Sequence, residues 1–179
     1  MDKELPKRKS PRLKYFDYSS EGAYFVTICV NNKMHILSEI QNITATGTNH
    51  IMVGEGLAPP EISIKLKHCG RIAKEQLQAL EIRYKNITVD DFIIMPDHIH
   101  AIIFLNEQTG GASPSPTLND VICTFKSLTS RICKQQCGIE KIFQRSFFEH
   151  IIRDKTDYET RKKYIHENPI RWYYKNQCE

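Results

Sequence analysis

The chain has 179 residues, enough for one domain, and 40% of them are hydrophobic, which suffices for a packed core. A formal charge of +4 and a pI of about 8.7 are compatible with a polyanionic partner but do not indicate one. No apolar run is long enough to cross a bilayer and the charged first residues lack an apolar stretch, so we expect neither a membrane span nor a secretory signal.

The cysteines, six in all, form no Cys-x-x-Cys pair and no regular framework. Cys133 and Cys137 are four residues apart, but no second pair follows at the spacing of a zinc finger. We therefore expect reduced thiols and a cytoplasmic location.

The first part of the chain predicts a basic arm and then one clear strand. Residues 1–18 are polar and rich in Lys and Arg, which favours either a phosphate-contacting arm or a solvated tail. Residues 23–30 are aromatic and β-branched and predict a strand. Residues 36–43 form either a short second strand or an irregular connection, and residues 44–60, rich in Gly and Pro, predict a loop.

The middle of the chain predicts a helix and a hairpin. Residues 66–84 have the spacing of an amphipathic helix, with apolar positions at 66, 69, 72, 73, 77, 80 and 82. Residues 87–95 and 98–105 are rich in β-forming types and flank the turn signal Met95-Pro96-Asp97. A Gly/Ser/Pro loop is expected at 106–116.

A second long helix is predicted over residues 118–137, with positions 118, 121, 122, 125, 128 and 132 on its inner face. Gly138 is typical of the residue that ends a helix. Residues 143–152 mix aromatic and polar types and are expected to be extended.

A third helix is predicted from Asp154 to about Glu167. Thr156 and Glu159 have the spacing of a capping box at its start. Pro169 disfavours helical geometry in the residue before it, which predicts the end of the helix.

The predicted order is strand, helix, strand, strand, helix, short strand, helix. It fits an α+β fold of the ferredoxin-like βαββαβ type, in which an antiparallel sheet carries helices on one face, with an additional C-terminal helix. We expect residues 1–18 to form the arm and residues 19–179 to form a single domain.

Two histidines stand at the start of the predicted strand 98–105. Side chains alternate along a strand, so His98 and His100 share one face with Ile102 and Phe104. Two imidazoles in this arrangement can hold one divalent cation, although strand histidines can also simply cap a sheet edge.

The last helix carries Tyr164 and, four residues later, Asn168, so both lie on one helix face. A tyrosine hydroxyl attacks phosphorus when a divalent cation neutralises the charge that develops on the phosphate. Such a cation could be held by His98 and His100, with Asn168 as an oxygen ligand. The alternative is a tyrosine packed on the core. Tyr158 is expected to pack, and His166 is expected to face solvent.

Four segments, in this order, carry a family resemblance: YFVTICVNN, MPDHIHAIIF, FQRSFFEHIIRDKTDY and KKYIHENPIRW. They resemble the REP-associated tyrosine transposases, which are single-tyrosine HUH transposases, over residues 12–172. The resemblance places the HUH pair at His98 and His100, the nucleophile at Tyr164 and the third metal ligand at Asn168. It implies Mg²⁺ or Mn²⁺ as the cofactor, although imidazoles also suit Zn²⁺.

The reaction implied by the resemblance is cleavage and rejoining of single-stranded DNA through a 5′-phosphotyrosine link with release of a 3′-OH. Implied partners are single-stranded or hairpin DNA from repeated extragenic sequences, and the protein is expected to be monomeric or homodimeric and nucleoid-associated. Basic residues that either contact DNA or are solvated surface charges are Lys7, Arg8, Lys9, Arg12, Lys14, Arg145, Arg153 and Arg171. Phe147 and Phe148 either stack on unpaired bases or pack in the core.

Two other functions fit the same residues. A ferredoxin-like sheet with aromatic residues is also the architecture of non-catalytic nucleic-acid-binding modules. A zinc-dependent hydrolase could use the two histidines together with Asp97, but it would leave no covalent protein–DNA adduct.

Overall fold

The computed structural model describes residues 21–43, 61–107 and 116–176, and the observations below concern these ranges. The expected arm, with Lys7, Arg8, Lys9, Arg12 and Lys14, lies outside the described residues. So do the expected loop at 44–60 and most of the one at 106–116.

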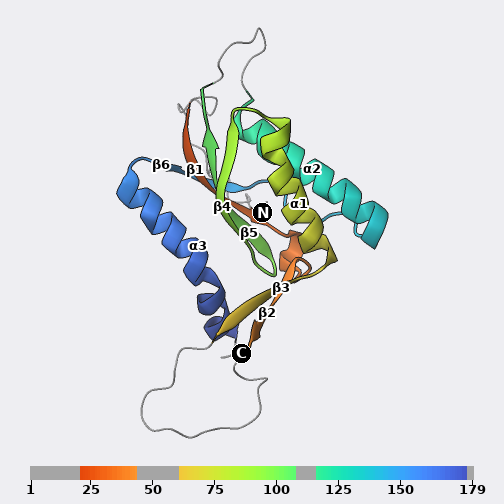
Figure 1. Ribbon diagram of the computed structural model, residues 1–179. Helices are drawn as coiled ribbons and strands as arrows, with labels where there is room; N and C mark the ends of the chain where they lie inside the picture. Colours follow the sequence, from red (N-terminus) through yellow and green to blue (C-terminus); the bar gives the residue numbers. More distant parts are fainter. Residues whose placement is uncertain (1–20, 44–60, 108–115, 177–179) are drawn as a thin grey trace, which may run out of the picture.

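A four-stranded antiparallel sheet forms the centre of the molecule (Figure 1). Its strands are, in spatial order, β4 (Ile87–Ile94), β5 (His98–Leu105), β1 (Gly22–Cys29) and β6 (Phe148–Ile152). Two helices connect them: α1 (His68–Arg83) leads into β4, and α2 (Leu118–Cys137) follows β5. The βαββαβ order and the antiparallel pairing confirm the ferredoxin-like expectation.

The main core lies between the sheet and the two helices α1 and α2. Strand alternation sends Tyr24, Val26 and Ile28 of β1 to this side, where all three are fully buried. On α2 the side chains of Thr129 and Cys133 are buried, whereas positions 128 and 132, expected on the inner face, are only half-buried. The buried set repeats every 3.6 residues from Leu118, and positions 128 and 132 fall at its margin.

Helix α2 has the predicted bounds because both of its ends are capped. At the start, the Thr117 hydroxyl accepts a hydrogen bond from the Asp120 amide while the Asp120 carboxylate accepts one from the Thr117 amide. At the end, Gly138 adopts φ 68°, a left-handed conformation that suits glycine.

A small hairpin precedes α1 and was not fully predicted. β2 (Ser38–Asn42) pairs with β3 (Ile62–Leu66), so the helix expected from residue 66 begins only at His68.

One position of α1 differs from the predicted apolar face. Ile82, expected on that face, is 87% exposed, because its direction on the helix is nearly opposite to that of Leu80.

Helix α3 (Lys155–Asn176) crosses the sheet face opposite α1 and α2 (Figure 1). The predicted end near Glu167 is wrong, because the helix continues through Pro169. Proline removes one backbone donor, and the following turns are held by tertiary contacts: Asn42 donates a hydrogen bond to the Tyr173 hydroxyl over 3.2 Å, and the rings of His35 and Trp172 are 5.5 Å apart.

The predicted capping box of α3 is also wrong. The Asp154 carboxylate accepts a hydrogen bond from the Asp157 amide over 2.9 Å, so Asp154 caps the helix two residues earlier than expected. Thr156 lies inside the first turn, where its carbonyl accepts a hydrogen bond from the Thr160 hydroxyl.

Gly70 is required where α1 passes the chain before β2. A Cβ atom at this position would lie 1.9 Å from the carbonyl oxygen of Leu37, which also accepts the amide hydrogen bond of Lys67. We expect Gly70→Ala to lower the free energy of unfolding by about 1–3 kcal/mol through overpacking, although Gly-to-Ala changes usually stabilise helices. Urea denaturation measures this, with the exposed Gln78→Ala as control; a stabilised Gly70→Ala protein would contradict the contact.

Candidate active site

The two histidines of β5 lie on the sheet face that α3 crosses. Ile99, Ala101 and Ile103 belong to the core beneath α1 and α2, while Ile102 and Phe104 pack with α3 residues, which confirms the predicted alternation. The ring centroids of His98 and His100 are 4.6 Å apart.

His100 is buried and presents one ring nitrogen without a partner. Its Nδ1 is 2.9 Å from the Thr27 hydroxyl, while its Nε2 is buried and makes no hydrogen bond to any residue that the structure describes. Burial, followed by the proximity of His98, lowers the pKa of His100 to about 3. The ring is therefore neutral near pH 7, and when its Nδ1–H donates to Thr27 its Nε2 carries a free lone pair.

His98 is oriented by the residue before it. Its Nδ1 lies 2.6 Å from Asp97 Oδ1, and the hydrogen bond from His98 holds the pKa of the Asp97 carboxyl below its usual value. An ionised carboxylate on Nδ1 fixes the ring and leaves Nε2 for a ligand, as is common for metal-binding histidines.

Tyr164 of α3 lies directly beside this pair. The centroid of its ring is 5.2 Å from that of His100 and 5.9 Å from that of Phe25, and Phe25 stacks on His100 at 5.1 Å. The Arg171 guanidinium is 5.8 Å from the Tyr164 ring. The tyrosine and the two histidines therefore share one site within a single chain.

Asn168 stays on the helix one turn after Tyr164 and is buried, with 7% of its surface exposed. Its amide makes no hydrogen bond to His98 or His100, so its role as a third ligand stays a prediction. Within the described ranges, no group of three or more His, Cys, Asp or Glu side chains is arranged to hold a metal ion. The orphaned Nε2 of His100, with His98 beside it, nevertheless fits a cation whose remaining ligands are an amide and oxygens of a phosphate.

The position of Tyr164 depends on how α3 is docked on the sheet. Ile165, 1% exposed, packs against Phe25 and Ile102 in a small second core. The Tyr158 hydroxyl donates a hydrogen bond to Asp90 over 2.7 Å, so Tyr158 does more than pack.

Two further contacts hold α3 on β4. Lys162 reaches both the Tyr158 hydroxyl, at 3.1 Å, and Asp90, at 3.8 Å. His166 Nε2 lies 2.9 Å from Asp91 Oδ2, although its side chain is 64% exposed. A bulge in β4 at this point interrupts the register between Val89 and Asp91.

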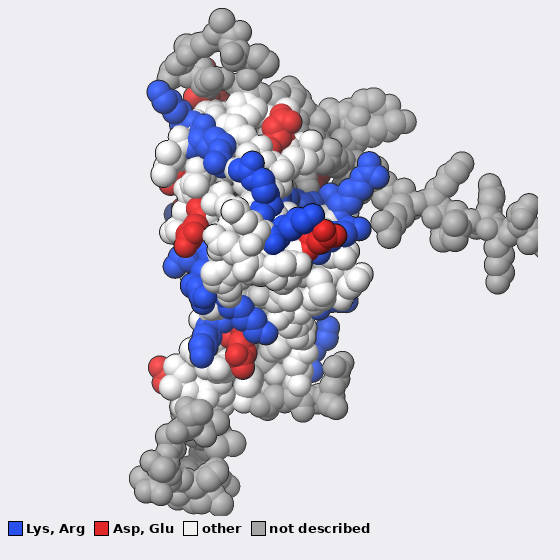
Figure 2. All heavy atoms as spheres, turned by 90° about the vertical axis from the view of Figure 1, so that its right-hand side faces the viewer, with Lys and Arg blue, Asp and Glu red and all other residues white. Residues whose placement is uncertain are grey.

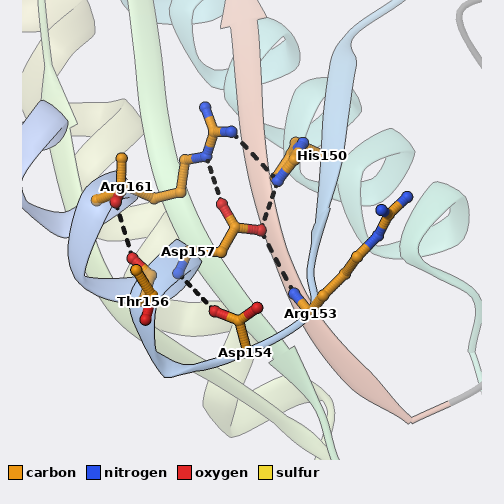
Figure 3. Close-up of polar contacts among 7 residues, drawn as sticks. His150, Arg153, Asp154, Thr156, Asp157 and Arg161 are labelled. Carbon is orange, nitrogen blue, oxygen red and sulfur yellow. Dashed lines mark hydrogen bonds and ion pairs between the residues drawn. The ribbon is translucent and has the colours of Figure 1, made fainter.

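Three further polar residues meet beside the site where β6 passes the start of α3 (Figure 3). Asp157 Oδ2 is 2.7 Å from His150 Nε2, and Asp157 Oδ1 is 3.1 Å from Arg161 Nε. Burial raises the pKa of Asp157, but hydrogen bonds from His150 and Arg161 outweigh it and lower the pKa overall. The Arg161 guanidinium lies 5.7 Å above the ring of Phe25, the ring that stacks on His100.

The chain is similar in sequence to known proteins. The chain is 29% identical to an uncharacterised protein of Haemophilus influenzae over 180 residues, covering 92% of this chain and 89% of that protein. It is 29% identical to the REP-associated tyrosine transposase of Escherichia coli K12 over 92 residues, covering 50% of this chain and 48% of that protein. No family model matches the chain.

A solved structure of a REP-associated tyrosine transposase bound to a REP hairpin has the same fold. It superposes with a TM-score of 0.55 at 17% identity, covering 89% of this chain and 74% of that one. The chain resembles the REP-associated tyrosine transposases. The similarity supports a transposase function.

The basic residues expected to contact DNA near Tyr164 have different surroundings. Arg171 forms an ion pair with Glu167 at 2.6 Å beside Tyr164, whereas Arg145 is exposed. Arg153 offers only its backbone amide to Asp157, and its side chain extends away from that carboxylate (Figure 3).

The opposite side of the molecule also carries positive charge. Figure 2 faces the helix layer and shows more Lys and Arg than Asp and Glu. Exposed basic residues of α1 and α2 are Arg71, Lys74, Arg83, Arg131 and Lys134.

In the part of the chain that the structure describes, no helix is long and apolar enough to cross a membrane.

Several residues of the site were not singled out from the sequence. Asp157 and Arg161 are four apart on a helix, which is the spacing of an ion pair, but their partner His150 comes from another element. Asp90 and Asp91 are adjacent acidic residues inside a run that otherwise favours a β-strand. Two adjacent polar residues interrupt the alternation of apolar and polar positions, and this interruption is a sequence signal for the bulge.

We expect Ile165→Ala to lower the free energy of unfolding by about 2–4 kcal/mol, because it opens a cavity between α3 and the sheet. Chemical denaturation measures this change, and Glu159→Ala, an exposed position on the same helix, should be nearly neutral. Equal stability of the two variants would show that Ile165 does not hold the helix in place.

Proposed function

We propose that this protein is a transposase that cleaves and rejoins single-stranded DNA with Tyr164 as nucleophile and with Mg²⁺ or Mn²⁺ held by His98, His100 and Asn168. The observation that carries the proposal is the 5.2 Å approach of the Tyr164 ring to His100, whose buried Nε2 has no hydrogen-bond partner within the described ranges. A tyrosine merely packed on a core would not need a desolvated, neutral imidazole beside it.

Hairpin DNA is the substrate we propose. The related transposase of known structure was solved with a REP hairpin bound. The sequence resemblance extends through the segments that carry the histidines and the tyrosine. We therefore propose that the chain acts at hairpin-forming repeated extragenic sequences.

The reaction that we propose is the one implied by the resemblance to the single-tyrosine transposases. The Tyr164 oxygen attacks phosphorus and loses its proton, the bond from phosphorus to the 3′-oxygen breaks, and the 3′-oxygen leaves as a hydroxyl after taking up a proton. The product is a 5′-phosphotyrosine link that conserves the phosphodiester bond energy. Attack by the 3′-OH of another strand reverses these bond changes and frees Tyr164.

The residues around the phenol have separate parts in this step. The Arg171 guanidinium, 5.8 Å from the ring, favours the negative charge that develops on the phenol oxygen. Asp97 and Thr27 hold the two imidazoles in fixed orientations. A bound divalent cation would supply charge neutralisation at the phosphate oxygens. Because Tyr164 approaches the histidines of its own chain, we propose that it acts in cis and that a monomer suffices.

The proposal is tested with single-stranded DNA that contains the hairpins flanking the gene, incubated with the full chain and Mn²⁺. We expect an adduct that survives SDS, and we expect Tyr164→Phe to reduce it by about 10³-fold or more, because the attacking oxygen is lost. Tyr174→Phe is the matched control, since Tyr174 is exposed on the same helix, and it should form the adduct normally.

Two outcomes would contradict the proposal. An adduct that persists in Tyr164→Phe would assign the nucleophile to another residue. Tight binding by the wild-type chain without any cleavage in Mn²⁺ would instead favour a non-catalytic nucleic-acid-binding module.

A further inference from the structure

A row of side chains leads from His100 to the edge of the sheet. Thr27 of β1 pairs with His100 of β5 on one side and with Phe148 of β6 on the other. Directly paired residues point to the same face, and strands are about 4.8 Å apart, so Phe148 lies roughly 10 Å from His100 on the same surface. β6 is the edge strand, so this row opens at the border of the sheet.

Phe148 is an exposed aromatic residue at the end of this row. Its neighbour Phe147 points into the main core and is 5% exposed, whereas Phe148 is 56% exposed. Helix α3 packs over Phe25 and Ile102 and leaves Phe148 uncovered. An uncovered aromatic ring on a sheet face beside a DNA-cleaving site is suited to stacking on a base.

The next row holds a fixed cation. His150 pairs with Phe25, and above them the Arg161 guanidinium is held by Asp157 at 3.1 Å and lies 3.2 Å from His150 Nε2. Nε of Arg161 donates to Asp157, and one Nη lies beside His150 Nε2, whose own hydrogen is directed at Asp157. The other Nη points away from both partners (Figure 3). No contact among the described residues occupies that nitrogen. A guanidinium fixed in this way can donate to phosphate oxygens with little further loss of freedom.

Phe148 and Arg161 are presented at neighbouring positions of the same sheet face. Phe148 and His150 are two residues apart on one strand face, which is about 7 Å. Arg161 lies against His150, so the exposed ring and the free guanidinium edge are presented from neighbouring positions of one sheet face, where a single nucleotide could contact both.

We infer that Phe148 and Arg161 form a binding subsite for one unpaired nucleotide of the DNA strand beside Tyr164, with its base stacked on Phe148 and its phosphate on Arg161. This inference rests on the proposed function, since it names how the strand is held at that site. Because every base has a π face, the subsite selects unpaired over paired DNA and discriminates little among bases. Arg161 and Phe148 are DNA-binding residues in this arrangement and take no part in the chemical step.

The test measures binding without cleavage. The full chain with Tyr164→Phe is titrated, in EDTA, into a fluorescein-labelled oligonucleotide of ten thymidines, and anisotropy gives Kd at several salt concentrations. We expect Phe148→Ala to raise Kd by about 5- to 150-fold, the range for loss of one stacked base, and Phe148→Trp to restore binding. We expect Arg161→Gln to raise Kd and to reduce the slope of log K against log salt by roughly one.

Matched controls separate this role from a structural one. Tyr174→Ala removes an exposed aromatic and Lys163→Gln an exposed cation from the same helix, and both should bind nearly as the parent does. With an oligonucleotide of abasic sites, Phe148→Ala should leave Kd unchanged, because there is no base to stack. Arg161→Gln should still raise Kd, because the phosphates remain. Circular dichroism confirms that each variant is folded.

The experiment distinguishes failure of the proposed subsite from failure of the proposed function. If both variants bind like the parent while the wild-type chain still forms the Tyr164 adduct, the subsite is wrong and the proposed function stands. If the chain binds no single-stranded DNA and forms no adduct, both are wrong. A Phe148→Trp protein as weak as Phe148→Ala would also overturn the stacking role.

Discussion

The docking of α3 across the open face of the sheet is the constraint on which the site depends. A ferredoxin-like sheet with helices on one side leaves its second face available, and here Ile165 closes part of that face against Phe25 and Ile102. The contacts with Asp90 and Asp91 fix the helix along the sheet. This docking places Tyr164 beside His100, although the two residues are 64 positions apart in the sequence.

Burial by α3 also sets the chemistry of the histidines. A hydrated imidazole titrates near neutral pH, but desolvation keeps His100 uncharged far into the acid range. Thr27 and Asp97 use the Nδ1 atoms of His100 and His98, so within the described residues the Nε2 atoms remain for a ligand. The docked helix α3 therefore places Tyr164 beside the histidines and also helps to bury His100, which keeps its imidazole neutral.

The parts of this structure that sequence predicts well are those decided by local rules. Alternation along β5 places both histidines on one face, and apolar periodicity together with the stop signal at Gly138 gives the bounds of α2. The parts it misses depend on distant partners. Pro169 signals the end of a helix, yet contacts from β2 to Tyr173 and from His35 to Trp172 support the turns beyond it. Likewise, His150 becomes part of a site only because β6 pairs with β1 beneath Arg161.

The most direct test of the account is anomalous diffraction from crystals of the full chain soaked in Mn²⁺. The account predicts one strong anomalous peak within coordination distance of Nε2 of both His98 and His100, on the side of the sheet where the Tyr164 phenol lies. A chain that binds Mn²⁺ elsewhere, for example at the Asp90 and Asp91 carboxylates, while the space between the imidazoles holds none, would contradict it.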